Sequence, residues 1–310
     1  MKILVTGGGG FIGSHLADKF LDEKNELILV LKNKKKTHNI SQILNRVKVE
    51  EVDVTDFTKL GDCIDNNEPD LLVHLAGETS HTKSFEKPLY NIDVNAKSTL
   101  FLLEKIRKSK LDCRFILGST FIVIGRPSKL PVTEETPCNP TTIYGINRLA
   151  SENYCKVYNE VYGLDTIIFR ITNSFGPREQ FIPNKNAVNY LIYKAFKKEE
   201  ITIYDEGKFF RDIIYIKDVI EGIKTISEKG KSGNLYWISS GNKTWFYEFG
   251  KLLEDLTSAK IKYIESPTYT KKVDVGNFLV DNTKLKSLGW SQNYSLKDGI
   301  KETLEFFKSL

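Results

Sequence analysis

The chain has 310 residues, of which 40% are hydrophobic and 27% charged, the composition of an ordinary soluble globular protein with one large domain or two unequal ones. Its 45 basic and 40 acidic residues are mostly interspersed and leave a net charge of +5, so the clustered basic face that binds nucleic acid is not predicted. Neither a disulfide framework nor a metal site is predicted, because the four cysteines lie far apart without metal-ligand spacing: Cys63, Cys113, Cys138 and Cys155.

The amino-terminal segment predicts a dinucleotide site. Met1 leads directly into an apolar strand without a signal-peptide pattern or a membrane-spanning stretch, so we expect a cytoplasmic protein that does not associate with membranes. The strand enters a turn of four glycines, Gly7–Gly10, and then a helical pattern that opens at Phe11. Such a turn could be flexible and empty, but a second strand at Leu27–Leu31 completes a βαβ unit. In that unit, backbone N–H groups at the helix N-terminus bind a pyrophosphate.

Strands and helices alternate through the first half of the chain. Short apolar runs predict strands over Val47–Val52, Leu71–Leu75 and Arg114–Leu117, and a long helical pattern covers Pro88–Arg107. This alternation predicts a Rossmann-type α/β fold, in which a doubly wound parallel sheet carries helices on both faces.

The pattern changes after about residue 170. Loops and shorter strands follow, and the chain ends in an amphipathic helix over Leu296–Phe307. We therefore expect a Rossmann domain over residues 1–170 and a smaller α/β substrate-binding cap over residues 171–310, with some segments of the second part returning to the first.

Side chains that follow each strand are candidates for the site, because ligands of an open parallel sheet bind at its carboxyl edge. His74 lies near the end of one predicted strand, and we interpret it as a hydrogen-bonded core histidine rather than a catalyst. The small residues within Leu75–Gly77 would let a cofactor pass close to the backbone. Asp53 follows another strand; it could accept a hydrogen bond from an adenine amine or cap the helix that begins near Asp56.

A hydroxyl group and a tyrosine–arginine pair form a candidate catalytic group. Ser119 and Thr120 follow the strand that begins at Arg114, while Tyr144 and Arg148 lie four residues apart at the start of a predicted helix. Residues at this spacing share one helix face, and a fixed cation beside a tyrosine favours the phenolate that acts as a general base. Thr120 could then orient a substrate oxygen. The alternative is a helix with a surface arginine and an unrelated loop hydroxyl.

Stretches along nearly the whole chain resemble the extended short-chain dehydrogenase/reductase superfamily, in particular its nucleotide-sugar epimerases, dehydratases and reductases. They are TGGGGFIG, HLAG, GSTFIVIG, YGINR, the segment from Phe169 to Arg178, FRDIIYI, and DNTKL followed by LGW. The resemblance implies hydride transfer at a sugar carbon with a nicotinamide cofactor, and a nucleoside-diphosphate sugar as substrate. It also implies a homodimer in which helices over Leu89–Arg107 and Tyr144–Val161 pack as a four-helix bundle.

The resemblance implies roles for individual residues. Tyr144 becomes the general acid/base, with the hydroxyls of Ser119 and Thr120 beside it. Cofactor contacts are implied for Gly7, Gly10, Phe11, Ile12, Gly13, Lys32, Asn33, Asp53, Val54, Leu75, Ala76, Gly77, Tyr144 and Arg148. Substrate contacts are implied for Thr79, Thr120, Tyr144, Asn173, Arg211 and Asp274. The guanidinium of Arg211 suits phosphate oxygens, and its alternative is an ion pair with adjacent acidic residues.

Three departures from the family pattern modify this expectation. Arg148 stands where the family has lysine; it keeps the charge, but its larger planar head need not reproduce the ribose contacts of lysine. Phe121 and Ile122 replace the acidic pair of the dehydratases, and because neither can carry a proton, 4,6-dehydration is disfavoured. The basic segment Lys32–Lys36 replaces the ribose-binding aspartate of NAD users and favours the 2′-phosphate of NADP, unless it is a solvated loop without a ligand.

These observations predict an oxidoreductase that transfers hydride at sugar carbon 4. The favoured interpretation is an NADP-dependent reductase of a nucleoside-diphosphate 4-keto-6-deoxysugar. An NAD-dependent 4-epimerase of the UDP-glucose type uses the same residues and stays open as the alternative. The exchange of lysine for Arg148 also leaves open a catalytically silent regulator that only binds NADP.

Overall fold

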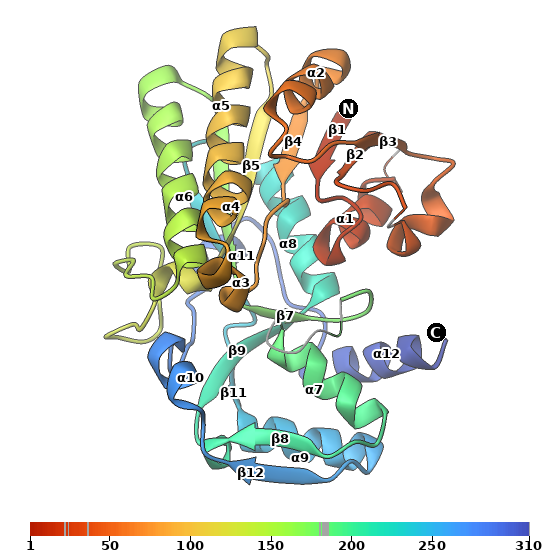
Figure 1. The fold of residues 1–310 in the computed structure, drawn as a ribbon, viewed down its shortest axis with the longest axis vertical. Coiled ribbons are helices and arrows are strands. Elements are labelled where there is room, and N and C mark those ends of the chain that lie inside the picture. Colours follow the sequence, from red (N-terminus) through yellow and green to blue (C-terminus); the bar gives the residue numbers. More distant parts are fainter. Residues whose placement is uncertain (22, 24, 36, 180, 182–185, 310) are drawn as a thin grey trace.

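The computed structural model describes residues 1–310 except 22, 24, 36, 180, 182–185 and 310. Among the described residues, seven parallel strands form a central sheet in the order β10-β6-β5-β4-β1-β2-β3 (Figure 1). The chain winds outward from β1 in both directions, which confirms the predicted Rossmann-type α/β fold. The strands are β1 (Lys2–Thr6), β2 (Glu26–Leu31), β3 (Lys48–Glu51), β4 (Leu71–His74), β5 (Arg114–Thr120), β6 (Thr166–Ile171) and β10 (Leu235–Ile238).

Alternating side chains of the strands pack into two hydrophobic cores, one on each face of the sheet. Ile3 and Val5 of β1 pack with α1 and α8, whereas Leu4 packs with α2, α5 and α6 on the opposite face. This division follows from the two-residue period of a strand, and it explains why the parallel strands read as continuous apolar runs. The helices are α1 (Phe11–Leu21), α2 (Phe57–Asn67), α5 (Ser98–Ser109), α6 (Ile143–Tyr162) and α8 (Ile216–Lys229).

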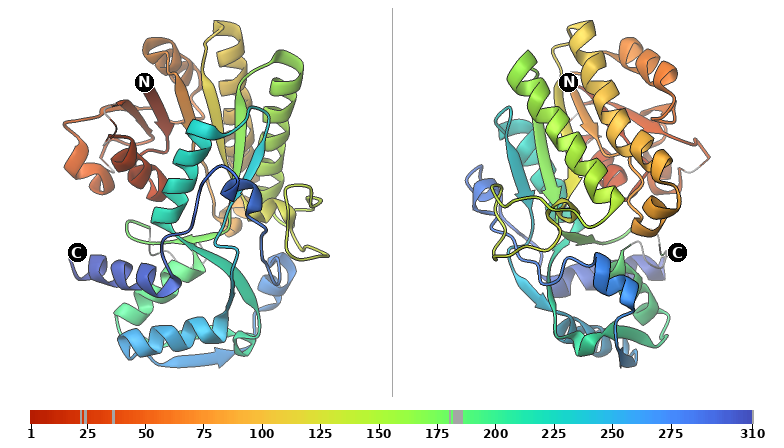
Figure 2. Two further views of the ribbon diagram at one scale, coloured as in Figure 1. Left: turned by 180° about the vertical axis from the view of Figure 1, so that it is seen from behind. Right: turned by 60° about the vertical axis from the view of Figure 1, so that its left-hand side comes forward.

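A second, smaller part lies beyond the carboxyl edge of the large sheet (Figures 1 and 2). In its described residues it holds a three-stranded sheet, β11-β9-β7, and a two-stranded parallel sheet, β12-β8. Its elements are β7 (Asn173–Phe175), α7 (Ala187–Phe196), β8 (Ile201–Tyr204), β9 (Phe210–Tyr215), β11 (Lys243–Trp245), α9 (Phe246–Thr257), β12 (Ile261–Ile264), α10 (Thr268–Val273) and α12 (Leu296–Lys308). The short helix α11 (Thr283–Lys286) packs instead against β10 of the large sheet.

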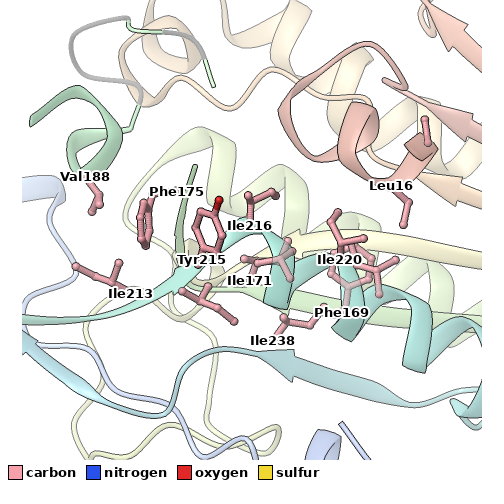
Figure 3. Packing of buried hydrophobic residues seen from close by; sticks show 14 of the residues in the cluster. Leu16, Phe169, Ile171, Phe175, Val188, Ile213, Tyr215, Ile216, Ile220 and Ile238 are labelled. Atoms are coloured by element: carbon pink, nitrogen blue, oxygen red, sulfur yellow. The ribbon is translucent and has the colours of Figure 1, made fainter. Parts of the chain in front are cut away.

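The two parts share one core and exchange chain segments. The strand β10 pairs with β6 through Leu235 and Ile168, so a segment of the second half completes the large sheet. Figure 3 shows the shared core, in which Leu16 of α1 and Phe169 of β6 belong to the same buried cluster as Tyr215 of β9. Within the described residues, none of the helices has the length and apolar character needed to cross a membrane.

The largest differences from the predicted extents concern one strand and one helix. The strand expected at Arg114–Leu117 continues to Thr120, which brings its last hydroxyl into the edge of the sheet. The helix expected over Pro88–Arg107 is divided by a π-helical turn, and its pieces are α4 (Pro88–Ile92), η2 (Asp93–Lys97) and α5. The backbone carbonyl of Asn95 in this turn accepts hydrogen bonds from the hydroxyls of Thr99 and Ser151. Widened turns of this kind are frequent at functional sites.

Candidate active site

The glycine turn between β1 and α1 allows close approach of backbone to backbone. Gly7 has a φ of 72°, and a Cβ atom there would lie 3.0 Å from the backbone nitrogen of Ala76. A Cβ on Gly13 would lie 2.3 Å from the carbonyl oxygen of Gly7. The predicted cofactor segments around Gly7, Gly13 and Ala76 therefore converge at the N-terminus of α1, where unpaired N–H groups favour an anion.

Tyr144 and Arg148 occupy the first turns of α6. The side chain of Thr142 caps this helix by accepting a hydrogen bond from the backbone nitrogen of Gly145 at 3.0 Å, and the cap fixes where the helix begins. Tyr144 is 5% exposed and Arg148 is 3% exposed. The interpretation of Arg148 as a surface arginine is therefore wrong.

The guanidinium of Arg148 lies against Gly77, at the carboxyl end of β4. A Cβ atom on Gly77 would lie 3.0 Å from Nη2 of Arg148 and 2.7 Å from Oδ1 of Asn95. Within the described residues, Nε and Nη1 of Arg148 and Oδ1 of Asn95 are buried without a hydrogen-bond partner. Buried polar groups are normally paired, so these atoms fit a polar ligand such as the hydroxyl groups of a cofactor ribose. The residues present thus suit a dinucleotide.

Asn95 was not found from the sequence, since its only signal would be a polar residue inside an amphipathic helical pattern.

Thr120 and Ser119, both predicted near Tyr144, have different surroundings. Thr120 ends β5, is half-buried and accepts a hydrogen bond from the backbone nitrogen of Ile122 at 3.3 Å. Among the described residues, no acceptor for the Thr120 hydroxyl proton is found. Ser119 donates instead to Oε1 of Glu152 at 2.5 Å, and Glu152 forms a buried ion pair with Arg170 at 2.6 Å. Ser119 therefore joins β5 to α6 in this structure.

The expected cofactor loop after β2 is partly neutralised by its own neighbours. Lys32 forms an ion pair with Asp53 at 2.7 Å and donates to the hydroxyl of Tyr90 at 3.1 Å. The hydrogen bond to Asp53 raises the pKa of Lys32, so this lysine is firmly charged. The side chain of Asn33 accepts from the backbone nitrogen of Lys35, whereas Lys36 lies outside the described residues.

Asp53 does not cap the next helix. The N-cap of α2 is Asp56, whose side chain accepts from the backbone nitrogen of Lys59, and Asp53 accepts instead from Thr55. The capping interpretation of Asp53 is therefore wrong. Val54, which follows it, is buried in the sheet core.

His74 is the hydrogen-bonded core histidine that the sequence predicted. Its ring nitrogens contact the hydroxyls of Thr6 at 2.7 Å and Ser98 at 3.2 Å. Burial lowers the pKa of His74 to about 3, so the ring is neutral at physiological pH and cannot act as an acid there.

Three of the expected substrate residues, Asn173, Arg211 and Asp274, lie on the second part, and two of them are in contact. Arg211 of β9 donates to both carboxylate oxygens of Asp274, at 2.7 and 2.8 Å, and its guanidinium lies over the ring of Phe209. Asn173 starts the neighbouring strand β7 and stands opposite Ile213, which places it on the same face of that sheet as Arg211. The ion pair of Arg211 is thus with Asp274 and not with an adjacent acidic residue. Thr79 lies exposed in the segment before α3 (His81–Glu86).

The comparisons with known proteins confirm the class that the sequence resembled, the extended short-chain dehydrogenases/reductases. The family model described as GDP-mannose 4,6 dehydratase matches residues 4–303. The chain belongs to this family of NAD-dependent nucleotide-sugar epimerases and dehydratases.

Its relatives match over nearly the full length. A Methanocaldococcus jannaschii protein named "Putative UDP-glucose 4-epimerase" is 32% identical, with 99% of this chain and 98% of that protein covered. The UDP-glucose 4-epimerase of Thermotoga maritima, solved with UDP-glucose, is 30% identical with a TM-score of 0.92, covering 100% of this chain and 99% of that one. The Thermus thermophilus UDP-glucose 4-epimerase, solved with NAD, is 25% identical with a TM-score of 0.90 and covers 99% of both chains.

Proposed function

We propose that the protein is an NAD-dependent 4-epimerase of a nucleoside-diphosphate hexose, with UDP-glucose as the first candidate substrate. The observation that carries this proposal is the buried pair of Tyr144 and Arg148. Among the residues that the structure describes, two buried guanidinium nitrogens of Arg148 have no hydrogen-bond partner, and the group lies beside the carboxyl end of β4. Relatives that are named as UDP-glucose 4-epimerases support the choice of reaction.

The chemistry of the chain's own residues is proton transfer. Bound NAD supplies a reversible hydride acceptor for sugar carbon 4. Tyr144 takes the proton of the sugar hydroxyl as that carbon is oxidised and returns it when the carbon is reduced from the opposite face. Arg148, one turn further along the same helix face, adds a permanent positive charge to this end of the site, and Thr120 donates a hydrogen bond to the sugar oxygen.

The residues after Thr120 argue against loss of water from the sugar. Phe121 and Ile122 form the start of a short 3-10 helix, η3 (Phe121–Ile124), and neither side chain can transfer a proton. Elimination needs an additional acid and base. We therefore do not propose the 4,6-dehydratase reaction of other family members.

The choice of NAD departs from the expectation of NADP. That expectation depended on the charge of Lys32–Lys36, but Lys32 is paired with Asp53. An acidic side chain this close to the adenosine ribose would repel a 2′-phosphate. Lys34 and Lys35 remain exposed, and this observation keeps an NADPH-dependent reductase of a 4-keto-6-deoxysugar as the second candidate.

A direct assay separates these possibilities. The purified protein is incubated with NAD and UDP-glucose, and we expect UDP-galactose to form without net accumulation of NADH. Consumption of NADPH by a nucleoside-diphosphate 4-keto-6-deoxysugar, without interconversion of UDP-hexoses, would replace the epimerase by the reductase. Cofactor binding without turnover of either substrate class would leave only a regulator that senses the cofactor.

We also infer a homodimer built on α5 and α6, which lie side by side at one edge of the molecule (Figures 1 and 2). Three apolar side chains of α6 are exposed: Ile146 at 54%, Val157 at 48% and Val161 at 65%. Their spacing places them within one side of the helix. Exposed apolar surface of this kind marks an interaction site.

A further inference from the structure

We propose that His81 is a specificity-determining residue of the sugar subsite, where its imidazole forms a hydrogen bond with a hydroxyl group of the sugar. The inference rests on the proposed function and adds a contact that neither the motifs nor the comparisons assign. His81 belongs to none of the stretches that resemble the family.

The local structure fixes the position of His81. It is the first residue of α3, directly after the N-cap Ser80, whose side chain accepts a hydrogen bond from the backbone nitrogen of Lys83 at 3.3 Å. This short helix stands at the junction of the two parts of the molecule (Figure 1) and contacts α6. The imidazole of His81 is stacked on the ring of Tyr144, with 6.0 Å between the ring centroids and 27° between the planes.

A second neighbour of His81 belongs to the proposed phosphate end of the site. Asp274, at the end of α10, is close enough for its charge to act on the imidazole, and both of its carboxylate oxygens accept hydrogen bonds from Arg211. His81 is thus near both the proposed acid/base and the carboxylate that holds the proposed phosphate ligand. In a nucleoside-diphosphate sugar the hexose ring joins the reacting carbon to the diphosphate, so the sugar must pass this imidazole.

A second contact closes the same boundary. Phe85, one turn after His81, meets Tyr269 of α10 edge to face, with 6.2 Å between the centroids. Both rings are partly exposed, at 43% and 48%. The segments that flank the site, α3 and α10, thus touch at its outer rim.

The chemistry of His81 fits a hydroxyl group. In the part of the chain that the structure describes, neither ring nitrogen has a hydrogen-bond partner. Burial lowers the pKa of His81, and the charge of Asp274 only partly opposes this effect. The ring is then neutral at physiological pH, with one N–H donor and one acceptor. A sugar hydroxyl, which both donates and accepts, is the matching partner.

Two substitutions separate the hydrogen bond from the packing. His81→Phe keeps a flat ring against Tyr144 and removes both polar atoms, whereas His81→Gln keeps a donor and an acceptor. Calorimetry on the NAD-loaded protein then measures the dissociation constants of UDP-glucose and UDP. We expect His81→Phe to raise the dissociation constant of UDP-glucose by about threefold to tenfold, which corresponds to the loss of one neutral hydrogen bond. The affinity for UDP should be unchanged, and His81→Gln should recover part of the loss.

Substrate analogues and a neighbouring residue complete the test. The same measurement is made with UDP-glucose analogues that each lack one sugar hydroxyl. The analogue without the hydroxyl that His81 binds should have the same affinity for the wild type and for His81→Phe. Thr82→Val, which removes a hydroxyl from the exposed next residue of α3, serves as the control and should change neither constant. The proposal would be overturned if His81→Phe weakened the binding of UDP and of UDP-glucose equally, or weakened neither. It would also be overturned if His81→Phe weakened the binding of every analogue. Because binding is measured, this result stands apart from whether UDP-hexoses are epimerised.

Discussion

Asp212, the residue after Arg211 on β9, is a buried carboxylate that joins the two parts of the molecule. It accepts hydrogen bonds from the backbone and side chain of Ser240, from the backbone nitrogens of Gly241 and Val280, and from the hydroxyl of Thr172. Burial raises the pKa of Asp212 to about 6, although these hydrogen bonds oppose the rise. The carboxylate thus fixes the strand that carries Arg211. Its burial makes the charged form less favourable than it would be in water.

This raised pKa predicts a pH-dependent stability. Because the folded protein binds the Asp212 proton more tightly than the unfolded chain does, this residue's contribution is greatest below about pH 4 and is lost as the pH rises to about 6. The change amounts to about 3 kcal/mol. We therefore compare the unfolding free energies of the wild type and of Asp212→Asn, measured in urea. The wild-type value minus the variant value should be larger at pH 4 than at pH 7. A constant difference at both pH values would contradict this account, and Asp62→Asn, at an exposed site, is the control.

Among the elements, the turn after β2 holds a pair of opposite charges. The strand ends at Leu31, and the next side chain, Lys32, forms an ion pair with Asp53 after β3. In a doubly wound sheet the adenosine ribose of a dinucleotide binds near this position. We propose that the balance between these two charges sets the preference for NAD or NADP.

Asp53→Asn should shift this discrimination toward NADP. The substitution leaves the charge of Lys32 without its partner, so the ratio of the NADP to the NAD dissociation constant should fall by about fivefold, or about 1 kcal/mol for one charge near a phosphate. Fluorescence titration with both cofactors measures the ratio. Asp56→Asn, which alters the cap of α2, is the matched control. An unchanged ratio in Asp53→Asn would show that Asp53 does not offset Lys32.

The elements that the sequence could predict are those set by local rules. Glycine runs, strand-length apolar segments and the four-residue spacing of Tyr144 and Arg148 are readable because the backbone responds to neighbours in the chain. The stack of His81 on Tyr144 and the pair of Arg211 with Asp274 join side chains that are 63 residues apart. Such contacts depend on how the elements pack, and no local pattern encodes them. The π-helical turn at Asn95 was also missed, because the sequence analysis treated Pro88–Arg107 as one continuous helical pattern.

At the scale of the whole molecule, the proposed dimer would bury the outer face of α6. Val157→Glu puts a carboxylate in the middle of the exposed apolar stripe, and an unpaired buried charge costs several kcal/mol. Dimerisation should weaken by more than about a hundredfold, as seen by light scattering during size-exclusion chromatography. Ile264→Glu, at an exposed site on β12, should leave the dimer intact. A Val157→Glu variant that remains dimeric at low concentration would place the interface elsewhere.

We propose that Tyr144 moves the proton during hydride transfer at the sugar, and the turnover of Tyr144→Phe measures this role. Phenylalanine keeps the ring that packs against His81 and removes only the hydroxyl. We expect the kcat for UDP-hexose interconversion to fall by about a hundredfold or more, with NAD affinity unchanged and with Tyr154→Phe, on the same helix, close to wild type. A Tyr144→Phe enzyme whose kcat stays within about threefold of wild type, less than the smallest acid–base contribution, would contradict it.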